Sequence, residues 1–374
     1  MKQGTPPALM FLEEAIAEAK RKNLFRDRVP SNAAPHTSFC SNDYLGLADR
    51  PAPREACGAG SSRLVAGERD IHRRLERAAA RLVGQPASLT FTSGYAANVG
   101  LLGALAGPED LIVSDALNHA SLIDGAHLSR ARIVVVPHLD VDAVARALDA
   151  KARNAFVVTE SYFSMDADSP DLSALRRLCD ERGAALVVDE AHALGVLGPG
   201  GAGLCVEQGV VADAVVGTFG KAFGAAGAFV AGCAPLVAWQ WNRARSFVFS
   251  TGMSPVVAAA ALGGLDRAEK EPWRRQRALQ AASELRRGLG ALGAELRGFG
   301  HVIPWVLGDP REALAFSAEL REQGIDVPAI RPPSVPSGTA RLRFTVSAAL
   351  QGEDIQRVVD AVAAVKRGGL RPRG

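Results

Sequence analysis

The stretches 185-ALVVDEAH-192 and 214-AVVGTFGK-221 decide the fold, because each is a short apolar run that ends in polar or glycine-rich residues. Similar apolar runs occur at 111–114, 132–136, 155–159 and 228–231, with helical patterns such as 72–83, 141–150 and 171–182 between them. Continuous apolar strands separated by helices are typical of a mainly parallel sheet covered on both faces. The sequence therefore predicts an α/β domain whose functional residues lie in loops beyond the strand ends.

The two ends of the chain differ from this central part. Residues 9–22 have an amphipathic helical pattern. After about residue 254, helical patterns at 256–271, 274–292, 311–323 and 353–366 alternate with strand patterns at 302–307, 325–330 and 341–346. We therefore expect an N-terminal helical arm over 1–45, a large domain over 46–262 and a small α+β domain over 263–374.

Composition excludes several classes of protein. The 43 Lys and Arg residues against 40 Asp and Glu residues leave a net charge of only +3, and no basic stripe predicts a nucleic-acid partner. The uncharged stretch 222–242 is interrupted by Gly, Pro, Gln and Asn, so we expect no membrane span, and no signal peptide follows Met1. Five widely spaced cysteines without a CxxC pair predict a cytoplasmic protein with no disulfide framework and no metal site.

Lys221 is the first candidate for chemistry. It is the only lysine between Lys151 and Lys270, and it follows an apolar strand in a glycine-rich turn. Among side chains only lysine forms a Schiff base, so this setting indicates amine chemistry. Taken alone, the motif is equally compatible with a lysine that extends from a turn into solvent.

Asp189 and His192 follow a neighbouring strand and suggest a partner for that chemistry. A carboxylate at a strand end can pair with a protonated pyridine nitrogen and keep the ring cationic, which makes the ring an electron sink. His192 lies three residues further on and can reach the phenolate oxygen of the same ring. Taken singly, a helix cap at Asp189 and a satisfied core histidine at His192 remain open alternatives.

Three further segments carry weaker signals. Gly94 and Tyr95 lie at an expected helix start, where free backbone N–H groups favour a phosphate. His119 offers an aromatic ring that can stack on a cofactor, and Ser164 follows another strand as a hydrogen-bond donor. Each reading has an ordinary alternative, since many helices begin this way and a lone histidine is more often structural.

Together these segments resemble one family, the α-oxoamine synthases, over nearly the whole chain and in family order. The resemblance implies an aspartate-aminotransferase-like fold (fold type I) that binds pyridoxal 5'-phosphate, and a homodimer with active sites at the subunit interface. The matching segments are 41-SNDYLGL-47, 58-GAGSSR-63, 93-SGY-95, 118-NHAS-121, 160-ESYFSMD-166, 189-DEAH-192 and 218-TFGK-221.

The resemblance also implies roles for individual residues. Lys221 would hold the cofactor and act as the catalytic base, Asp189 would pair with the pyridine nitrogen, and His192 would meet the phenolate oxygen. His119 would stack on the ring and act with Lys221 and Asp189 in catalysis. The implied cofactor contacts also include Gly94, Tyr95, Ser164 and Thr218, with Thr251 of 247-FVFST-251 reaching the neighbouring subunit's phosphate.

The block at 329–343 resembles the alanine-using branch of the family. By that resemblance Arg343 grips the carboxylate of the amino acid, Ser334 lies near the substrate where the family commonly has Thr, and Asn42 also contacts substrate. Arg26 is the implied contact of the acyl substrate, with Arg28 as an alternative. The implied reaction joins L-alanine to a pimeloyl thioester, carried by CoA or by an acyl carrier protein, with loss of CO2, on the route to biotin.

Three other outcomes remain open. One is a glycine-using sister enzyme, such as 2-amino-3-ketobutyrate ligase or 5-aminolevulinate synthase. The second is a non-catalytic relative that uses its dimer surface for interaction. The third is a dinucleotide-binding domain, although 58-GAG-60 lacks the strand and acidic residue that a dinucleotide site needs. The segment 48–57 is shorter than the helix that the family usually has before its Gly-Ala-Gly block, so the preferred acyl chain also stays open.

Overall fold

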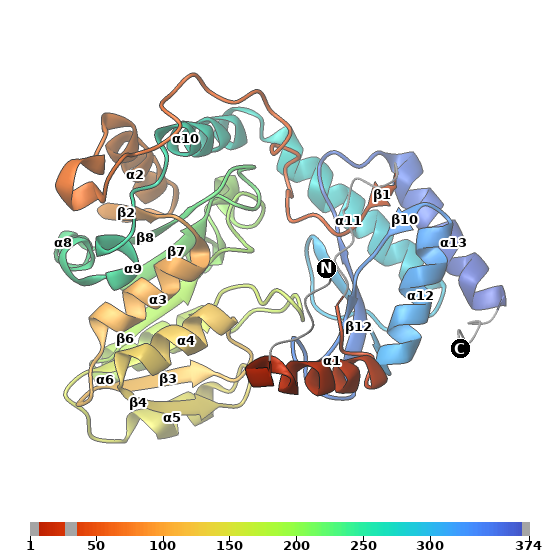
Figure 1. The fold of residues 1–374 in the computed structure, drawn as a ribbon, viewed down its shortest axis with the longest axis horizontal. Helices are drawn as coiled ribbons and strands as arrows, with labels where there is room; N and C mark the ends of the chain where they lie inside the picture. The colour runs from red at the N-terminus through yellow and green to blue at the C-terminus, as the bar shows by residue number, and fades with distance from the viewer. Residues whose placement is uncertain (1–6, 27–35, 369–374) are drawn as a thin grey trace.

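The computed structural model describes residues 7–26 and 36–368 of the 374-residue chain. A large domain built on a seven-stranded sheet lies beside a small domain built on a three-stranded sheet (Figure 1). Each domain has a hydrophobic core of its own. The chain therefore has the architecture expected from the alternation of apolar strands and helices.

The large sheet is mainly parallel, as predicted. Its strand order is β2-β8-β7-β6-β5-β3-β4, and β8 runs antiparallel to both of its neighbours. The sequence patterns did not identify β2, which forms one edge of the sheet. The strands are β2 (Ala87–Phe91), β3 (Leu111–Asp115), β4 (Arg132–Val136), β5 (Ala155–Glu160), β6 (Ala185–Asp189), β7 (Ala214–Thr218) and β8 (Ala228–Gly232).

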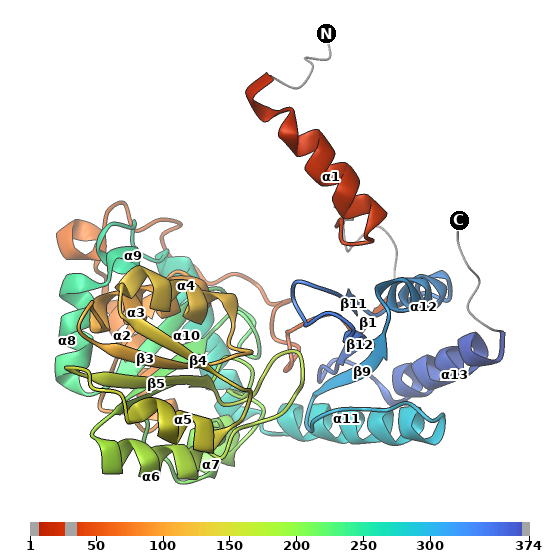
Figure 2. The same cartoon turned by 90° about the horizontal axis from the view of Figure 1, so that it is seen from below.

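Helices cover both faces of this sheet (Figure 2). Successive residues of a strand pack on opposite faces, so Val157 belongs to one core cluster whereas Phe156 and Val158 belong to the other. Short helical turns occur at η2 (Arg63–Gly67), η3 (Pro199–Gly201) and α7 (Leu204–Glu207). One face carries α3 (Gly94–Leu105), α4 (Ala120–Ser129), α8 (Ala234–Arg243) and α9 (Arg245–Val248), and the other carries α2 (Asp70–Leu82), α5 (Val141–Leu148), α6 (Leu172–Arg182) and α10 (Pro255–Lys270).

The small domain corrects one prediction. The stretch 325–330 is not a single strand: β10 pairs with β1, whereas β11 pairs with β12 in a different sheet. Pro328 lies between the two short strands, and a proline has no N–H to donate to a ladder. The elements are β1 (Thr37–Ser38), β9 (Val302–Gly308), β10 (Ile325–Asp326), β11 (Ala329–Ile330), β12 (Ala340–Thr345), α11 (Trp273–Ala291), α12 (Pro310–Glu322) and α13 (Gly352–Gly368).

The N-terminal arm consists of η1 (Pro7–Leu9) and α1 (Phe11–Arg21), and α1 projects away from both domains (Figure 2). None of the residues of α1 is buried. At the other boundary, α10 continues through position 262, so the division at 262–263 falls inside a helix and stays a prediction, as do the bounds of the arm. Within the described ranges, no helix is both long enough and apolar enough to cross a membrane.

Candidate active site

The carboxyl ends of strands in the large sheet bring the predicted Asp189, Thr218 and Gly94 together with Glu160, which was not predicted. Glu160, Asp189 and Thr218 are the last residues of β5, β6 and β7, and Glu160 is in register with Asp189. Strands β2 and β7 are both antiparallel to β8, so they run in the same direction. The turn between Phe91 and Gly94 therefore opens at the same edge of the sheet, where the crevice of an open α/β fold is expected.

Lys221 lies on the turn after β7 and is partly buried. Burial lowers the pKa of its amine to about 8, against the attraction of the Asp189 and Glu160 carboxylates, which raise it. At pH 7 roughly a tenth of such amines are neutral, far more than for an ordinary lysine with a pKa near 10.4. Burial, followed by the charge of Asp189, in turn raises the pKa of Glu160 to about 8. The site thus holds a lysine that is ready for nucleophilic or base chemistry.

Asp189 is buried and accepts two hydrogen bonds from neutral groups. Its Oδ1 accepts the N–H of Ala191 at 2.8 Å, and its Oδ2 accepts an amide hydrogen of Asn98 at 2.7 Å. Its charge raises the pKa of Lys221, but among the described residues it forms no ion pair within 4.0 Å. Because a buried carboxylate is costly without a positive partner, this arrangement fits a protonated ring nitrogen.

His119 caps α4 and faces a cavity of about 440 Å³, a volume in the range of small-molecule sites. Ser164 and Ser334 line the same cavity. The backbone N–H of His119 donates to Glu160 at 2.7 Å, and its Nδ1 lies 2.7 Å from the Ser121 hydroxyl oxygen. Partial burial lowers the pKa of the imidazole.

The start of α3 forms a cradle for an anion. The N–H groups of Gly94 and Tyr95, in the first turn of α3, have no acceptor among the described residues. The N–H of Ala96 donates to the hydroxyl oxygen of Ser93. A Cβ placed on Gly94 would lie 4.0 Å from the Cβ of Thr218, so the helix terminus adjoins that threonine. Free N–H groups at a helix start fit a phosphate.

Arg343 brings a positive charge from β12 to the same edge. Its Nε donates to the backbone oxygen of Ser164 at 2.6 Å, and its Nη1 donates weakly to Asn42 at 3.4 Å. Its Nη2 is buried and has no partner among the described residues. A buried guanidinium nitrogen without a partner is an open position for a carboxylate oxygen.

His192 is buried and pairs with Tyr44, whose hydroxyl lies 2.7 Å from its Nδ1. Burial, together with the charges of Lys221 and Arg343, holds the pKa of His192 well below its ordinary value. His192 is therefore neutral at physiological pH. The Tyr44 hydroxyl is also 3.1 Å from Asn42, which links this pair to the arginine.

The family "Aminotransferase class I and II" matches residues 34–362. The chain belongs to this family. An 8-amino-7-oxononanoate synthase of Anaeromyxobacter dehalogenans is 47% identical over 341 residues, which cover 88% of this chain and 86% of the relative. One of Pseudomonas fluorescens is 41% identical over 375 residues, covering 94% and 96%.

The fold is also that of a solved structure. A variant of serine palmitoyltransferase from S. paucimobilis, with a bound PLP–myriocin aldimine, superimposes with a TM-score of 0.87. It is 26% identical and covers 98% of this chain and 99% of its own. The aminotransferase-like fold type expected from the sequence is thereby confirmed.

Within this aminotransferase-family chain, two predicted substrate residues meet at the cavity. The Nη2 of Arg26 donates to the hydroxyl of Ser334 at 3.1 Å, so the end of the N-terminal arm reaches the cavity wall. Arg331 fastens the arm there by donating to the backbone oxygen of Asn23. The alternative contact, Arg28, lies outside the described residues.

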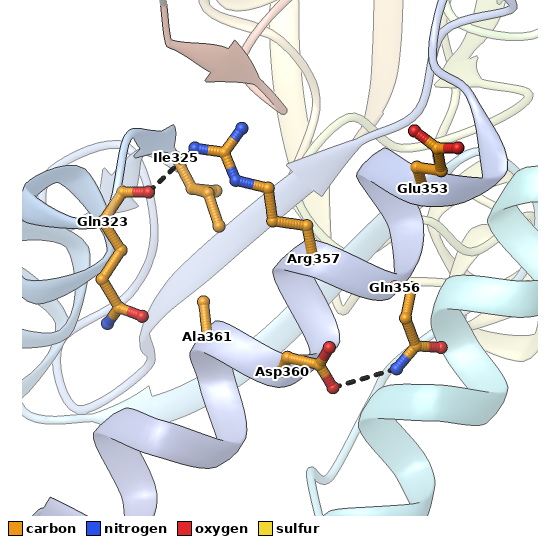
Figure 3. A pocket seen from close by; sticks show the side chains of 7 residues that line it. All are labelled: Gln323, Ile325, Glu353, Gln356, Arg357, Asp360 and Ala361. Atoms are coloured by element: carbon orange, nitrogen blue, oxygen red, sulfur yellow. Dashed lines mark hydrogen bonds between the residues drawn. The ribbon is translucent and has the colours of Figure 1, made fainter.

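Thr251 shares a crevice with Thr92, in the turn that precedes the predicted Gly94 and Tyr95. It lies exposed on the loop after α9 and lines a narrow crevice beside Arg63. The small domain has a hollow of about 480 Å³ on another surface, which none of the predicted residues lines (Figure 3). There Arg357 donates to the backbone oxygen of Gln323 at 3.0 Å and to the hydroxyl of Thr37 at 3.2 Å, so its guanidinium already has hydrogen-bond acceptors.

Sequence reasoning assigned no role to several residues that contact the site. Asn98 binds Asp189, Ser121 contacts His119, Tyr44 contacts His192, and Arg341 binds Asp166 at 2.8 Å across the two domains. A signal existed for Asn98, because it is a polar residue in the otherwise apolar helix 94–105. The others gave no signal beyond their presence in the matching segments.

Proposed function

We propose that this protein is an 8-amino-7-oxononanoate synthase, which joins L-alanine to a pimeloyl thioester and releases CO2 and the free thiol carrier. The observation that carries the proposal is the 47% identity to a synthase of that name over 88% of the chain. A second synthase at 41% identity covers 94% of the chain, including the 329–343 block. The product is a precursor of biotin.

Pyridoxal phosphate fits the described residues as the cofactor. Lys221 offers the amine, Asp189 the carboxylate for the ring nitrogen, and the N–H groups at the start of α3, with Thr218, the phosphate cradle. His192 would contact the phenolate oxygen, and His119 would stack on the ring. When bound, the cofactor supplies an electron-withdrawing ring that stabilises negative charge on the α-carbon of the amino acid.

The amino acid would be held by Arg343 and deprotonated by Lys221. The carboxylate of alanine would take the free Nη2 of Arg343, while Nε stays bound to Ser164 and fixes the direction of the guanidinium. The Lys221 amine, with a pKa near 8, is matched to taking the α-proton near neutral pH. Asn42 would steady Arg343 from its other side.

The acyl substrate would enter through the cavity that Ser334 and His119 line. Arg26 lies at its rim with one hydrogen bond to Ser334 and an exposed guanidinium. This position suits the free carboxylate at the far end of a pimeloyl chain.

The proposal includes a homodimer with Thr251 serving the partner's phosphate site. Thr251 is exposed on the loop after α9. The side chains of Val65, on η2, and Phe249, directly after α9, are 79% and 74% exposed. An exposed apolar surface of this kind is typical of an interface. The five free cysteines suit the cytoplasm, where the protein is proposed to work.

Turnover with a matrix of substrates tests the activity. Purified protein supplied with pyridoxal phosphate should form 8-amino-7-oxononanoate from L-alanine and pimeloyl-CoA, detected by mass spectrometry. We expect this pair to exceed glycine with acetyl- or succinyl-CoA, and serine with palmitoyl-CoA, at least about tenfold in kcat/KM, or roughly 1.4 kcal/mol in barrier. Faster turnover with glycine or serine would assign the protein to a sister activity instead.

A further inference from the structure

A continuous chain of hydrogen bonds joins His119 to Asp189 through two residues without an assigned role. Asn98 on α3 donates to Asp189 Oδ2 at 2.7 Å and to the Ser121 hydroxyl oxygen at 2.9 Å. That oxygen lies 2.7 Å from His119 Nδ1, which also accepts the backbone N–H of Ser121 at 3.2 Å. Asn98 and Ser121 are both buried.

The direction of every bond in this chain is fixed. The Asn98 group that faces Asp189 must be the NH2, because its oxygen would meet a carboxylate oxygen at 2.7 Å. Both amide hydrogens are then used, so the Ser121 oxygen accepts from Asn98 and its own hydrogen is free for His119. The backbone N–H of Ser121 cannot reverse its role. His119 Nδ1 is therefore an acceptor and carries no proton.

We infer that Asn98 and Ser121 are positioning residues that keep His119 neutral, with its single proton on Nε2, the nitrogen left free to donate. This inference rests on the proposed function, because it gives a purpose to the ring that faces the cavity. A neutral His119 offers a hydrogen-bond donor to a bound substrate or cofactor without a third positive charge beside Lys221 and Arg343. It also leaves the Asp189 charge for the cofactor's ring nitrogen.

The charges around His119 do not overturn this assignment. Burial has the largest effect on the pKa of His119 and lowers it. Asp189 and Asp124 raise this pKa, and Lys221 lowers it. Glu160 accepts the backbone N–H of His119 rather than a ring nitrogen. The net direction is a lowered pKa, which agrees with the hydrogen-bond geometry.

Nitrogen NMR of protein labelled with 15N-histidine tests the inference without turnover. The chain has seven histidines, and a His119→Gln variant identifies the His119 signals. In the protein with pyridoxal phosphate bound, at pH 7, we expect a bare Nδ1 and a protonated Nε2. A protonated Nδ1, either as the other tautomer or as imidazolium, would overturn the inference.

Two variants and two matched controls separate positioning from packing. Ser121→Ala and Asn98→Ala should each shift the Nε2–H preference of His119 by roughly fivefold, which corresponds to about 1 kcal/mol. Ser129→Ala removes another buried hydroxyl from α4, and Asn154→Ala removes another amide that donates to a buried aspartate, Asp110. Neither control variant should change the 15N chemical shifts of the His119 ring nitrogens.

Unchanged His119 signals in both test variants would mean that Asn98 and Ser121 only pack α3 against α4. If Asn98→Ala fails to fold, Ser121→Ala alone decides the outcome. The result is also independent of the proposed activity. A protein that prefers glycine or serine would lose the proposed function while the His119 tautomer still stood as measured.

Discussion

Replacement of Asp189 by asparagine should abolish most of the chemistry while leaving the fold intact. The carboxylate accepts hydrogen bonds from Ala191 and Asn98, and an asparagine of the same shape can keep only one of them. Leaving one buried donor unpaired costs about 1–3 kcal/mol of stability. The larger effect is electrostatic, because the variant removes the charge proposed to keep the cofactor's ring nitrogen protonated.

The magnitude follows from the cost of breaking a buried charge pair, about 3–5 kcal/mol. If most of this cost appears in the barrier to removal of the α-proton, the rate falls by roughly two to three and a half orders of magnitude. The substitution has a second consequence in the protein itself. Asp189 is the strongest influence that raises the pKa of Lys221, so the variant should hold that pKa below its present value of about 8.

Exchange of the α-proton of alanine with deuterated solvent, followed by NMR, measures the relevant step without the acyl substrate. Asp110→Asn is the matched control, since Asp110 is also buried and accepts hydrogen bonds from Gly107 and Asn154 at the opposite end of the sheet. We expect near-normal exchange in the folded control. Exchange in Asp189→Asn within about threefold of the unmodified protein would refute the role of Asp189 as the pyridine partner.

Two further outcomes follow from the geometry. Arg343→Lys removes the guanidinium, whose Nη2 is free while its Nε binds Ser164. The KM for alanine should therefore rise strongly, and kcat/KM should fall roughly a hundredfold, about 3 kcal/mol. An unchanged KM in steady-state assays would contradict this prediction. Burial lowers the pKa of His138, but the carboxylates of Asp115 and Asp168 outweigh burial and raise that pKa to about 10. The contribution of His138 to the free energy of unfolding is therefore complete below the ordinary histidine pKa near 6.5 and is lost as the pH rises through about 10. In urea unfolding, His138→Gln should therefore cost about 1.5–3 kcal/mol near pH 6 and progressively less toward pH 10, and a deficit that grew with pH would count against it.

The sequence predicted the central strands well because parallel strands buried on both faces are continuous apolar runs. Strand β2 was not predicted because Ser88 and Thr90 interrupt its run of apolar residues. Both are satisfied by α2, where Ser88 donates to the backbone oxygen of Glu76 and Thr90 bonds to its carboxylate. Such tertiary partners cannot be inferred from local periodicity. At 325–330, the pattern suggested a strand, but Pro328 divided it.

The candidate site was likewise only partly predictable from the sequence. Lys221, Asp189 and His119 were found because each follows a strand whose carboxyl end was itself predictable. The contacts that orient them join distant segments, such as Asn98 with Asp189 and Tyr44 with His192. Those pairings depend on how helices pack on the sheet, which the spacing of residues along the chain does not specify.

Borohydride trapping tests most directly whether Lys221 holds pyridoxal phosphate for chemistry on alanine. The chain contains seven lysines. After incubation with pyridoxal phosphate, reduction and tryptic digestion, mass spectrometry should find one reduced cofactor per chain on the peptide containing Lys221. Addition of L-alanine before reduction should release that label from the lysine. Labelling of Lys151 or Lys270 instead, or no stoichiometric label at all, would contradict the account.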